Sequence, residues 1–348
     1  MSMQSPFGGA MPTSTHMAER NIPFPSTISP EAQAALAMHA VLPAQTMLDP
    51  SDVEGWAAFK AQRAAADDGT ITAIALATSG LVIPERQSEL ERLEFGTAVA
   101  YVATPEGHNA DDERIYFNIH GGGMTEGGGV FAETSTRFAA GCYGVRVWGM
   151  DYRMLPDHPF PAGLDDCMTV YRELLKIRRP EQIIVGGVSG GANLTAALLL
   201  RARDEGLPLP AAAVLYSPAV DFTMSGDTHE TERFAMTSDG LGALADFYAT
   251  NDDVLNPYIS PLLGEFTAEF PPTILISGTR DFLLSDTVRL HRKLLKAGVH
   301  AELHVFEAAP HGGFGGHAPE DHEQVETVRN FIEAAWVAAA AQTTAPTR

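Results

Sequence analysis

Residues 183–194 read Ile-Ile-Val-Gly-Gly-Val-Ser-Gly-Gly-Ala-Asn-Leu, and this stretch decides the fold. An apolar run leads into Gly187-x-Ser189-x-Gly191, and a second apolar run follows at 194–200. Strand, sharp turn and helix in this order form the context that a G-x-S-x-G nucleophile elbow requires. Glycine must flank the serine because a Cβ would clash in so tight a turn. The pattern predicts that Ser189 lies at the C-terminal edge of a sheet, facing the positive N-terminal end of the next helix.

Composition and charge restrict the class of protein. The 348 residues can hold one large α/β domain with additions, or two domains. The formal net charge of −21 disfavours nucleic acid and anionic membranes through repulsion. No stretch reaches the roughly 18 apolar residues of a transmembrane helix, and residues 1–20 lack the pattern of a secretory signal. We therefore expect a cytoplasmic protein without membrane insertion, in which Cys142 and Cys167 are buried, inert thiols.

Strands and helices alternate from residue 114 to residue 340, which indicates a mostly parallel sheet covered on both faces. Earlier strands are predicted at 71–76, 81–84 and 97–104. Two helices should precede them, one beginning at Ser29 and Pro30 and one over about 51–66 with a serine cap. We expect a disordered N-terminus (1–25), an N-terminal helical cap segment (26–70), the main α/β domain (71–341) with a cap insertion at about 221–263, and a tail (342–348).

A run of glycines follows the strand predicted at residues 114–119. His120-Gly121-Gly122-Gly123 leaves backbone N–H groups unobstructed, and we expect those of Gly122 and Gly123 to form an oxyanion hole with that of Gly190. The alternatives are a flexible glycine loop or a phosphate-binding turn. A phosphate-binding loop requires a lysine followed by Ser or Thr after the glycines, and Met124-Thr125-Glu126 contains no lysine. His120 is interpreted as structural, anchoring the loop.

The general base must lie late in the chain. His311 follows the strand predicted at 301–306 and therefore lies at the correct edge of the sheet; its rivals are His300, His304, His317 and His322. The acid that orients the base should follow the preceding strand, which points to Asp281, 30 residues before His311. Asp286 is the rival, although a carboxylate in the first turn of a helix is expected for dipole reasons alone. The order Ser189, Asp281, His311 is that of the α/β-hydrolase fold.

Two other pairs of polar residues can be explained without assigning them to a functional site. Asp165 and Asp166 sit near a helix start, where dipole compensation and a solvated face are favoured. His300 and His304 have metal-ligand spacing for a helix, but on a strand four residues span roughly 13 Å, too far to share one ion. We therefore expect no metal site and no cofactor.

Three long motifs resemble those of the hormone-sensitive-lipase-like bacterial esterases, a branch of the α/β-hydrolase superfamily. They are HGGG at 120–123, DYRMLPDHPFPA at 151–162 and NPYISPL at 256–262. The resemblance covers about residues 71–340. It implies an α/β-hydrolase fold with a helical cap and the hydrolysis of carboxylic esters, commonly with short acyl chains. It also makes a homodimer plausible, although nothing in the residues requires one.

Three positions depart from the family's motifs. Val188 stands where the family usually has Asp or Thr, Gly190 replaces an alanine, and Met124 stands where an aromatic residue is common. The sequence therefore does not determine the shape of the acyl pocket. We expect the residues that line it to include Met124, Val188, Phe222 and Phe282, although core packing explains apolar residues equally well.

The sequence leads to a hypothesis of a serine carboxylester hydrolase that acts on short- to medium-chain acyl esters. His311 would take the Ser189 proton, Ser189 would attack the acyl carbon, and Asp281 would fix the imidazole. The partner would be a small-molecule ester. The alternatives are a lactone, amide or carbamate hydrolase with the same triad, and a non-catalytic small-molecule binder on this fold.

Overall fold

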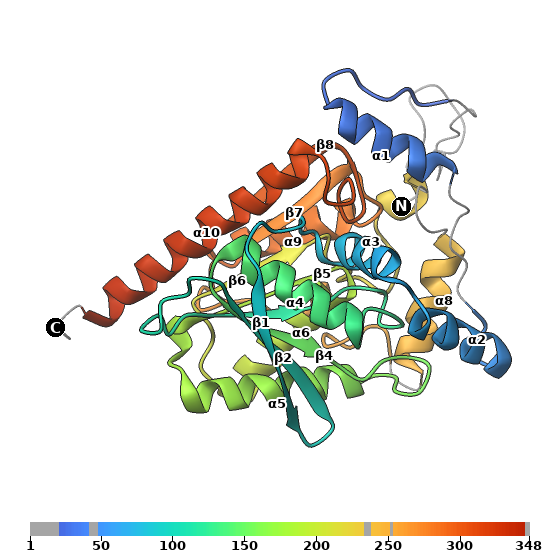
Figure 1. The fold of residues 1–348 in the computed structure, drawn as a ribbon. Helices are drawn as coiled ribbons and strands as arrows, with labels where there is room; N and C mark the ends of the chain where they lie inside the picture. The colour runs from blue at the N-terminus through green and yellow to red at the C-terminus, as the bar shows by residue number, and fades with distance from the viewer. Residues whose placement is uncertain (1–20, 42–47, 233–237, 251–252, 345–348) are drawn as a thin grey trace, which may run out of the picture.

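A computed structural model describes residues 21–41, 48–232, 238–250 and 253–344. Its centre is an eight-stranded sheet in the order β1-β2-β4-β3-β5-β6-β7-β8 (Figure 1). The first two strands pair antiparallel with their neighbours, and the other strand pairs are parallel. The strands are β1 (Ser88–Phe95), β2 (Ala98–Pro105), β3 (Ile115–Ile119), β4 (Arg146–Asp151), β5 (Ile183–Val188), β6 (Ala212–Tyr216), β7 (Thr273–Arg280) and β8 (Ala301–Pro310).

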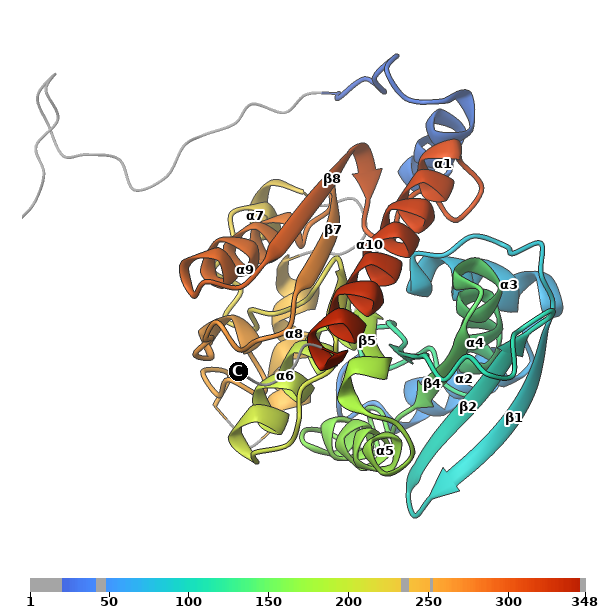
Figure 2. The same ribbon diagram turned by 90° about the vertical axis from the view of Figure 1, so that its left-hand side faces the viewer.

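Helices cover both faces of the sheet. Figure 2 shows β1 and β2 at one edge and β7 and β8 at the other. The core on one face is completed by α4 (Val130–Tyr143) and α10 (Pro319–Thr344). The core on the other is completed by α5 (Ala162–Ile177), α6 (Gly190–Asp204) and α9 (Leu284–Lys296). The predicted α/β-hydrolase fold, with its mostly parallel sheet, is therefore confirmed.

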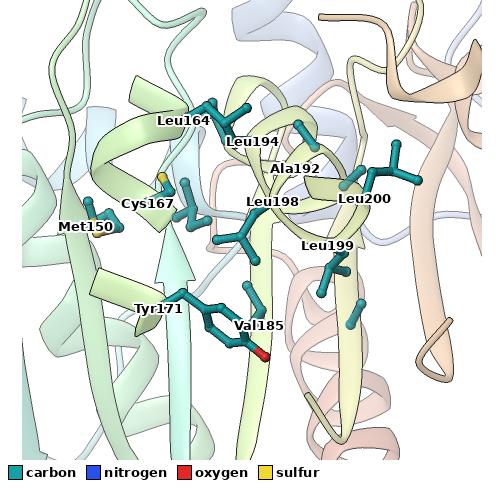
Figure 3. Close-up of a cluster of buried hydrophobic side chains, with 14 of the residues drawn as sticks. Met150, Leu164, Cys167, Tyr171, Val185, Ala192, Leu194, Leu198, Leu199 and Leu200 are labelled. Carbon is teal, nitrogen blue, oxygen red and sulfur yellow. The ribbon is translucent and has the colours of Figure 1, made fainter. Parts of the chain in front are cut away.

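The central strand β5 is buried along its whole length. A strand covered on both faces reads as a continuous apolar run because neither face meets water. Figure 3 shows Val185 of β5 in one cluster with Leu198 of α6 and Tyr171 of α5. All three side chains are fully buried, so the elbow that follows β5 rests on a closely packed base.

The two segments predicted to form the cap contain helices from separate parts of the chain. The N-terminal part holds α1 (Pro30–Val41) and α2 (Val53–Ala64), and the insertion holds α7 (Thr228–Thr231) and α8 (Ser238–Ala249). The two parts meet at α2 and α8, which lie close together in Figure 1. There the Trp56 ring packs on the Phe247 ring, with centroids 5.7 Å apart. The helix at Pro30 is as predicted. The cap of α2 is Asp52 rather than Ser51, because the Asp52 carboxylate accepts the N–H of Gly55.

Two of the predicted strands are wrong. Residues 71–76 lie inside a helix, α3 (Asp68–Ser79), which Asp67 caps by accepting the N–H of Thr70 and which ends at Gly80 in the left-handed region. Residues 81–84 form neither helix nor strand. The edge strand β1 was not predicted, because its charged sequence, SELERLEF, shows little apolar alternation.

The two chain ends also differ from expectation where they are described. Residues 1–20 lie outside the described residues, but the guanidinium of Arg280 donates to the Pro23 carbonyl at 2.9 Å and lies over the Phe24 ring. The expected disorder is therefore wrong for this piece. The predicted tail is helical up to Thr344, and residues 345–348 lie outside the described part. None of the described helices is both long and apolar enough to cross a membrane.

Candidate active site

The elbow between β5 and α6 places Ser189 in a strained backbone conformation, with a φ of 55°. Its glycines are needed for close backbone approach. A Cβ on Gly187 would lie 2.5 Å from the carbonyl of Gly191, and a Cβ on Gly191 would lie 2.1 Å from the carbonyl oxygen of Ile119. The Ser189 N–H donates to the Tyr216 carbonyl on the next strand. The turn therefore holds the nucleophile candidate between two strand ends.

Three side chains meet beside this elbow. The Nε2 atom of His311 lies 3.0 Å from the Ser189 hydroxyl oxygen. The Nδ1 atom of the same ring lies 3.0 Å from Asp281 Oδ1. Asp281 comes directly after β7 and His311 directly after β8, so parallel neighbouring strands deliver both to the same edge of the sheet. The structure thus brings together residues that are up to 122 positions apart in the chain.

The Asp281 carboxylate is fully buried but well supplied with donors. The Ser277 hydroxyl donates to Oδ2 at 2.7 Å, and the Leu283 N–H donates to Oδ1 at 3.0 Å. Burial alone would raise the pKa of Asp281, but His311 and the hydroxyls of Ser217 and Ser277 outweigh it and lower that pKa. The group is therefore ionised near neutral pH and can balance a positive imidazolium.

The rivals for acid and base lie elsewhere. Asp286 lies 3.2 Å from His229 and accepts the N–H groups of Val220 and Asp221, so it ties the start of the cap insertion to α9. His300 and His304 both lie 3.3 Å from the carboxylate of Glu302 on β8, and His317 and His322 are exposed. The structure therefore separates these residues from the Ser189 hydroxyl.

The glycine loop lies against the elbow. A Cβ built on Gly190 would be 3.4 Å from the backbone nitrogen of Met124 and 3.7 Å from Cα of Gly123. Gly122 and Gly123 both have positive φ, 105° and 59°, which L side chains rarely adopt. The Gly122 carbonyl accepts the N–H of Thr125 at 3.0 Å, which closes a tight turn. Backbone amides of the loop are thus gathered next to the N-terminus of α6.

His120, which precedes the glycines, is buried beneath the loop. Its ring stacks on Tyr152 at a centroid distance of 4.3 Å, and its Nδ1 lies 2.7 Å from the carbonyl of Gly121. The Tyr152 hydroxyl donates to the His120 carbonyl. These contacts fit a residue that anchors the loop and takes no part in proton transfer.

The four residues expected to line the pocket lie in different surroundings. Phe282 packs on the imidazole of His311, with ring centroids 4.5 Å apart, and Met124 is buried between the glycine loop and the elbow. Phe222 packs edge-on against Tyr248 of α8 at 5.6 Å. Val188 belongs to the core on the other face of the sheet, with Ile184 and Tyr216. Val188 therefore lies in a different core cluster from Met124 and Phe222, and its place in the acyl pocket stays a prediction.

Other residues singled out from the sequence have structural surroundings. Asp166 is buried and accepts N–H bonds from the Arg153 guanidinium at 2.9 Å and from its backbone, so a solvated face was the wrong interpretation for it. Burial raises the pKa of Cys142 to about 11 and that of Cys167 well above its usual value, so neither is a thiolate near pH 7. Within the described ranges, no three His, Cys, Asp or Glu side chains gather closely enough to hold a metal ion.

Residues that sequence reasoning missed support the acid and the pocket. Ser277 and Ser217 hold Asp281, and Leu244 of α8 lies over the glycine loop, 3.5 Å from where a Cβ on Gly123 would be. Ser277 lies on β7, four residues before Asp281, and four residues along a strand normally span roughly 13 Å, so this spacing gave no signal. Nothing in the sequence indicates which cap residues reach the loop.

Comparisons with known proteins agree with this geometry. A model of the alpha/beta hydrolase fold family matches residues 116–314, and the chain belongs to that family. An acetyl-hydrolase of Streptomyces hygroscopicus is 30% identical over 230 residues, covering 64% of this chain and 77% of the relative. The solved structure of esterase E25 is 32% identical with a TM-score of 0.76, covering 92% of this chain and 98% of that one.

The resemblance to hormone-sensitive-lipase-like esterases is confirmed as well. A solved esterase from the bacterial hormone-sensitive lipase family is 26% identical to this chain, with a TM-score of 0.72. The alignment covers 88% of this chain and 99% of the solved one. The similarity therefore extends over almost the whole length of the solved relative.

Proposed function

We propose that this carboxylesterase cleaves short- to medium-chain acyl esters by covalent catalysis at Ser189. The observation that carries the proposal is the unbroken chain from Ser189 Oγ to His311 Nε2 and from His311 Nδ1 to Asp281, each step 3.0 Å long. A hydroxyl and an imidazole at this distance are within reach for proton transfer. No other contact of the described residues places a base against an activated hydroxyl at the elbow of β5 and α6.

The reaction runs in two halves. His311 takes the Ser189 proton as the oxygen attacks the acyl carbon, and then gives the proton to the leaving alcohol. Water enters, loses its proton to His311 and releases the acid from Ser189 by the same route. Asp281 holds the Nδ1–H tautomer and stabilises the positive ring in both halves, because it stays ionised inside the protein.

Negative charge on the carbonyl oxygen would be held by backbone N–H groups. We assign this role to Gly122, Gly123 and Gly190, since the glycine loop and the N-terminus of α6 lie against each other at Ser189. Donors that are fixed in place cost no reorganisation when the charge develops, and the loss of one typically lowers the rate about 10²- to 10³-fold. The positive N-terminal end of the α6 dipole further stabilises the negative charge on this oxygen.

The apolar surroundings support an ester with a modest acyl chain. Phe282 packs on the imidazole of His311, Met124 lies beside Gly190, and Leu244 lies beside Gly123. Phe222 packs on Tyr248 of α8. The Streptomyces relative is named an acetyl-hydrolase, which supports a short acyl group here.

A series of p-nitrophenyl esters tests the proposal. We expect kcat/KM to be highest for acetate or butyrate and to fall beyond octanoate, and we expect Ser189→Ala to lower kcat about 10⁶-fold. Matched butyrolactone and p-nitrobutyranilide separate the ester from the lactone and amide alternatives. Faster turnover of either than of the butyrate ester would overturn the substrate class. Near-normal ester hydrolysis by Ser189→Ala would overturn the mechanism.

A further inference from the structure

An ion pair joins the N-terminal cap to the glycine loop. Nη2 of Arg63, in the last turn of α2, lies 2.5 Å from Oε2 of Glu126. Only 26% of the arginine side chain and 17% of the glutamate side chain are exposed. The guanidinium also lies 5.0 Å from the centre of the Phe59 ring on the same helix, which braces it. The pair is therefore held in place, unlike a freely solvated surface pair.

Glu126 belongs to the turn that shapes the loop. Its N–H donates to the Gly122 carbonyl at 3.0 Å. A Cβ built on Gly122 would lie 2.2 Å from the carbonyl oxygen of Glu126 and 2.9 Å from its Cγ. The side chain of Glu126 thus folds back against Gly122. Glu126 thus fills the space that a side chain on Gly122 would take, and with the Glu126 N–H bonded to the Gly122 carbonyl the two residues are expected to move together.

The charge of Glu126 creates an electrostatic problem. Burial raises the pKa of this carboxyl group, and Arg63 opposes that rise. A bare carboxylate next to an oxyanion hole would repel the negative charge that develops on the substrate, and a partly buried site screens this repulsion poorly. Arg63 supplies the balancing charge from a helix that is distant in sequence from every residue of the triad.

We infer that Arg63 is a positioning residue for the oxyanion hole. Through Glu126 it fixes the Gly122 peptide and cancels the carboxylate charge, so that full turnover requires α2 to be docked on the glycine loop. The inference rests on the proposed function, since it takes the Gly122 N–H as an oxyanion donor. It adds to that function a link between the cap and the rate of the chemical step.

The test compares Arg63→Met with a matched control on the same helix. Lys60 lies one turn earlier and pairs with Asp157, but those side chains are 49% and 62% exposed. Exposed pairs contribute little, so Lys60→Met should keep kcat and KM. Arg63→Met should lower kcat for p-nitrophenyl butyrate about 10- to 100-fold, with KM within about threefold. A trifluoromethyl ketone, which mimics the tetrahedral state, should lose affinity by the same factor as kcat/KM.

Two further variants identify the charge as the cause. Arg63→Met combined with Glu126→Gln removes both charges and should recover at least about tenfold of the lost kcat, because the harm of removing one partner comes from the unpaired charge that remains. Arg63→Lys keeps the charge and should retain most of the activity. These variants also keep the test valid if Arg63→Met does not fold.

The outcomes separate this inference from the proposed function. Equal kcat values for Arg63→Met and Lys60→Met would overturn the inference, as would a loss confined to KM or a double variant no better than Arg63→Met. If Ser189→Ala is inactive in the same assay, the proposed mechanism stands regardless. If Ser189→Ala is active, the proposed mechanism fails and the assignment of Gly122 fails with it.

Discussion

Asp281→Asn would remove one charge from the centre of the site while leaving its shape almost unchanged. In the structure, Oδ1 accepts from His311 Nδ1 and from the Leu283 N–H, each at 3.0 Å, and Oδ2 accepts the Ser277 hydroxyl at 2.7 Å. The Leu283 N–H is a fixed backbone donor, whereas the Ser277 hydroxyl can rotate and accept instead. The amide oxygen of the variant should therefore take the place of Oδ1, so that His311 keeps its Nδ1–H tautomer.

The expected loss follows from that orientation. A hydrogen bond to a charged group contributes about 1.5–3 kcal/mol. The variant keeps a hydrogen bond to His311 but loses the negative charge, so at most this whole contribution is lost; at about 1.4 kcal/mol for each factor of ten, kcat should fall by no more than roughly 150-fold. A reversed tautomer would cost about 10⁴-fold. We expect the smaller loss, with KM within about threefold, because Asp281 acts on the transition state and makes no contact with bound ester.

The assay is steady-state hydrolysis of p-nitrophenyl butyrate, with Asp286→Asn as the matched control. Asp286 is equally buried but contacts His229 and the backbone of the cap insertion, so its substitution should leave kcat within about threefold. A loss of about 10⁴-fold for Asp281→Asn would refute the hydrogen-bond reasoning. Equal effects of the two substitutions would refute the choice of Asp281 as the acid.

Two further predictions concern the elbow and the cap. Gly191→Ala should abolish activity, because its Cβ would lie 2.1 Å from the Ile119 carbonyl oxygen. In Gly190→Ala the nearest atoms would lie 3.3 Å or more from the new Cβ, so this variant should keep activity within about tenfold. Equal kcat values for the two variants would contradict this prediction. Burial alone would lower the pKa of His229, but Asp286 outweighs it and raises that pKa. The resulting stabilisation is complete below about pH 6.5 and is lost as the pH rises through the raised value. The melting temperature of the wild type should therefore fall more steeply above pH 6.5 than that of His229→Gln, and parallel curves would refute the link.

The meeting of the three candidate triad residues could be predicted from the sequence, because each of them follows directly on a strand. Parallel strands end at one edge, so a serine after β5, an aspartate after β7 and a histidine after β8 must converge there. The local motif at 187–191 determines the turn, and the comparisons agree with the fold that it predicted. Long motifs at strand ends thus carry most of the information about the chemistry.

The cap and the contacts across it could not be read in this way. Residues 71–76 are rich in β-branched side chains, yet the Asp67 cap and the burial of Ala75 and Leu76 make them helical. The pairing of Arg63 with Glu126 joins residues 63 positions apart and leaves no periodic pattern in either segment. Such contacts depend on where the cap docks, which is a property of the tertiary structure alone.

The central claim is that Ser189 is the nucleophile, and covalent labelling tests it most directly. The enzyme is treated with diethyl p-nitrophenyl phosphate, and peptide mass mapping then locates the adduct while residual esterase activity is measured. We predict a diethylphosphoryl group on the Ser189 Oγ, with activity lost in proportion to the labelled fraction. Inactivation by an adduct on another residue, or full activity after complete labelling of Ser189, would contradict the account.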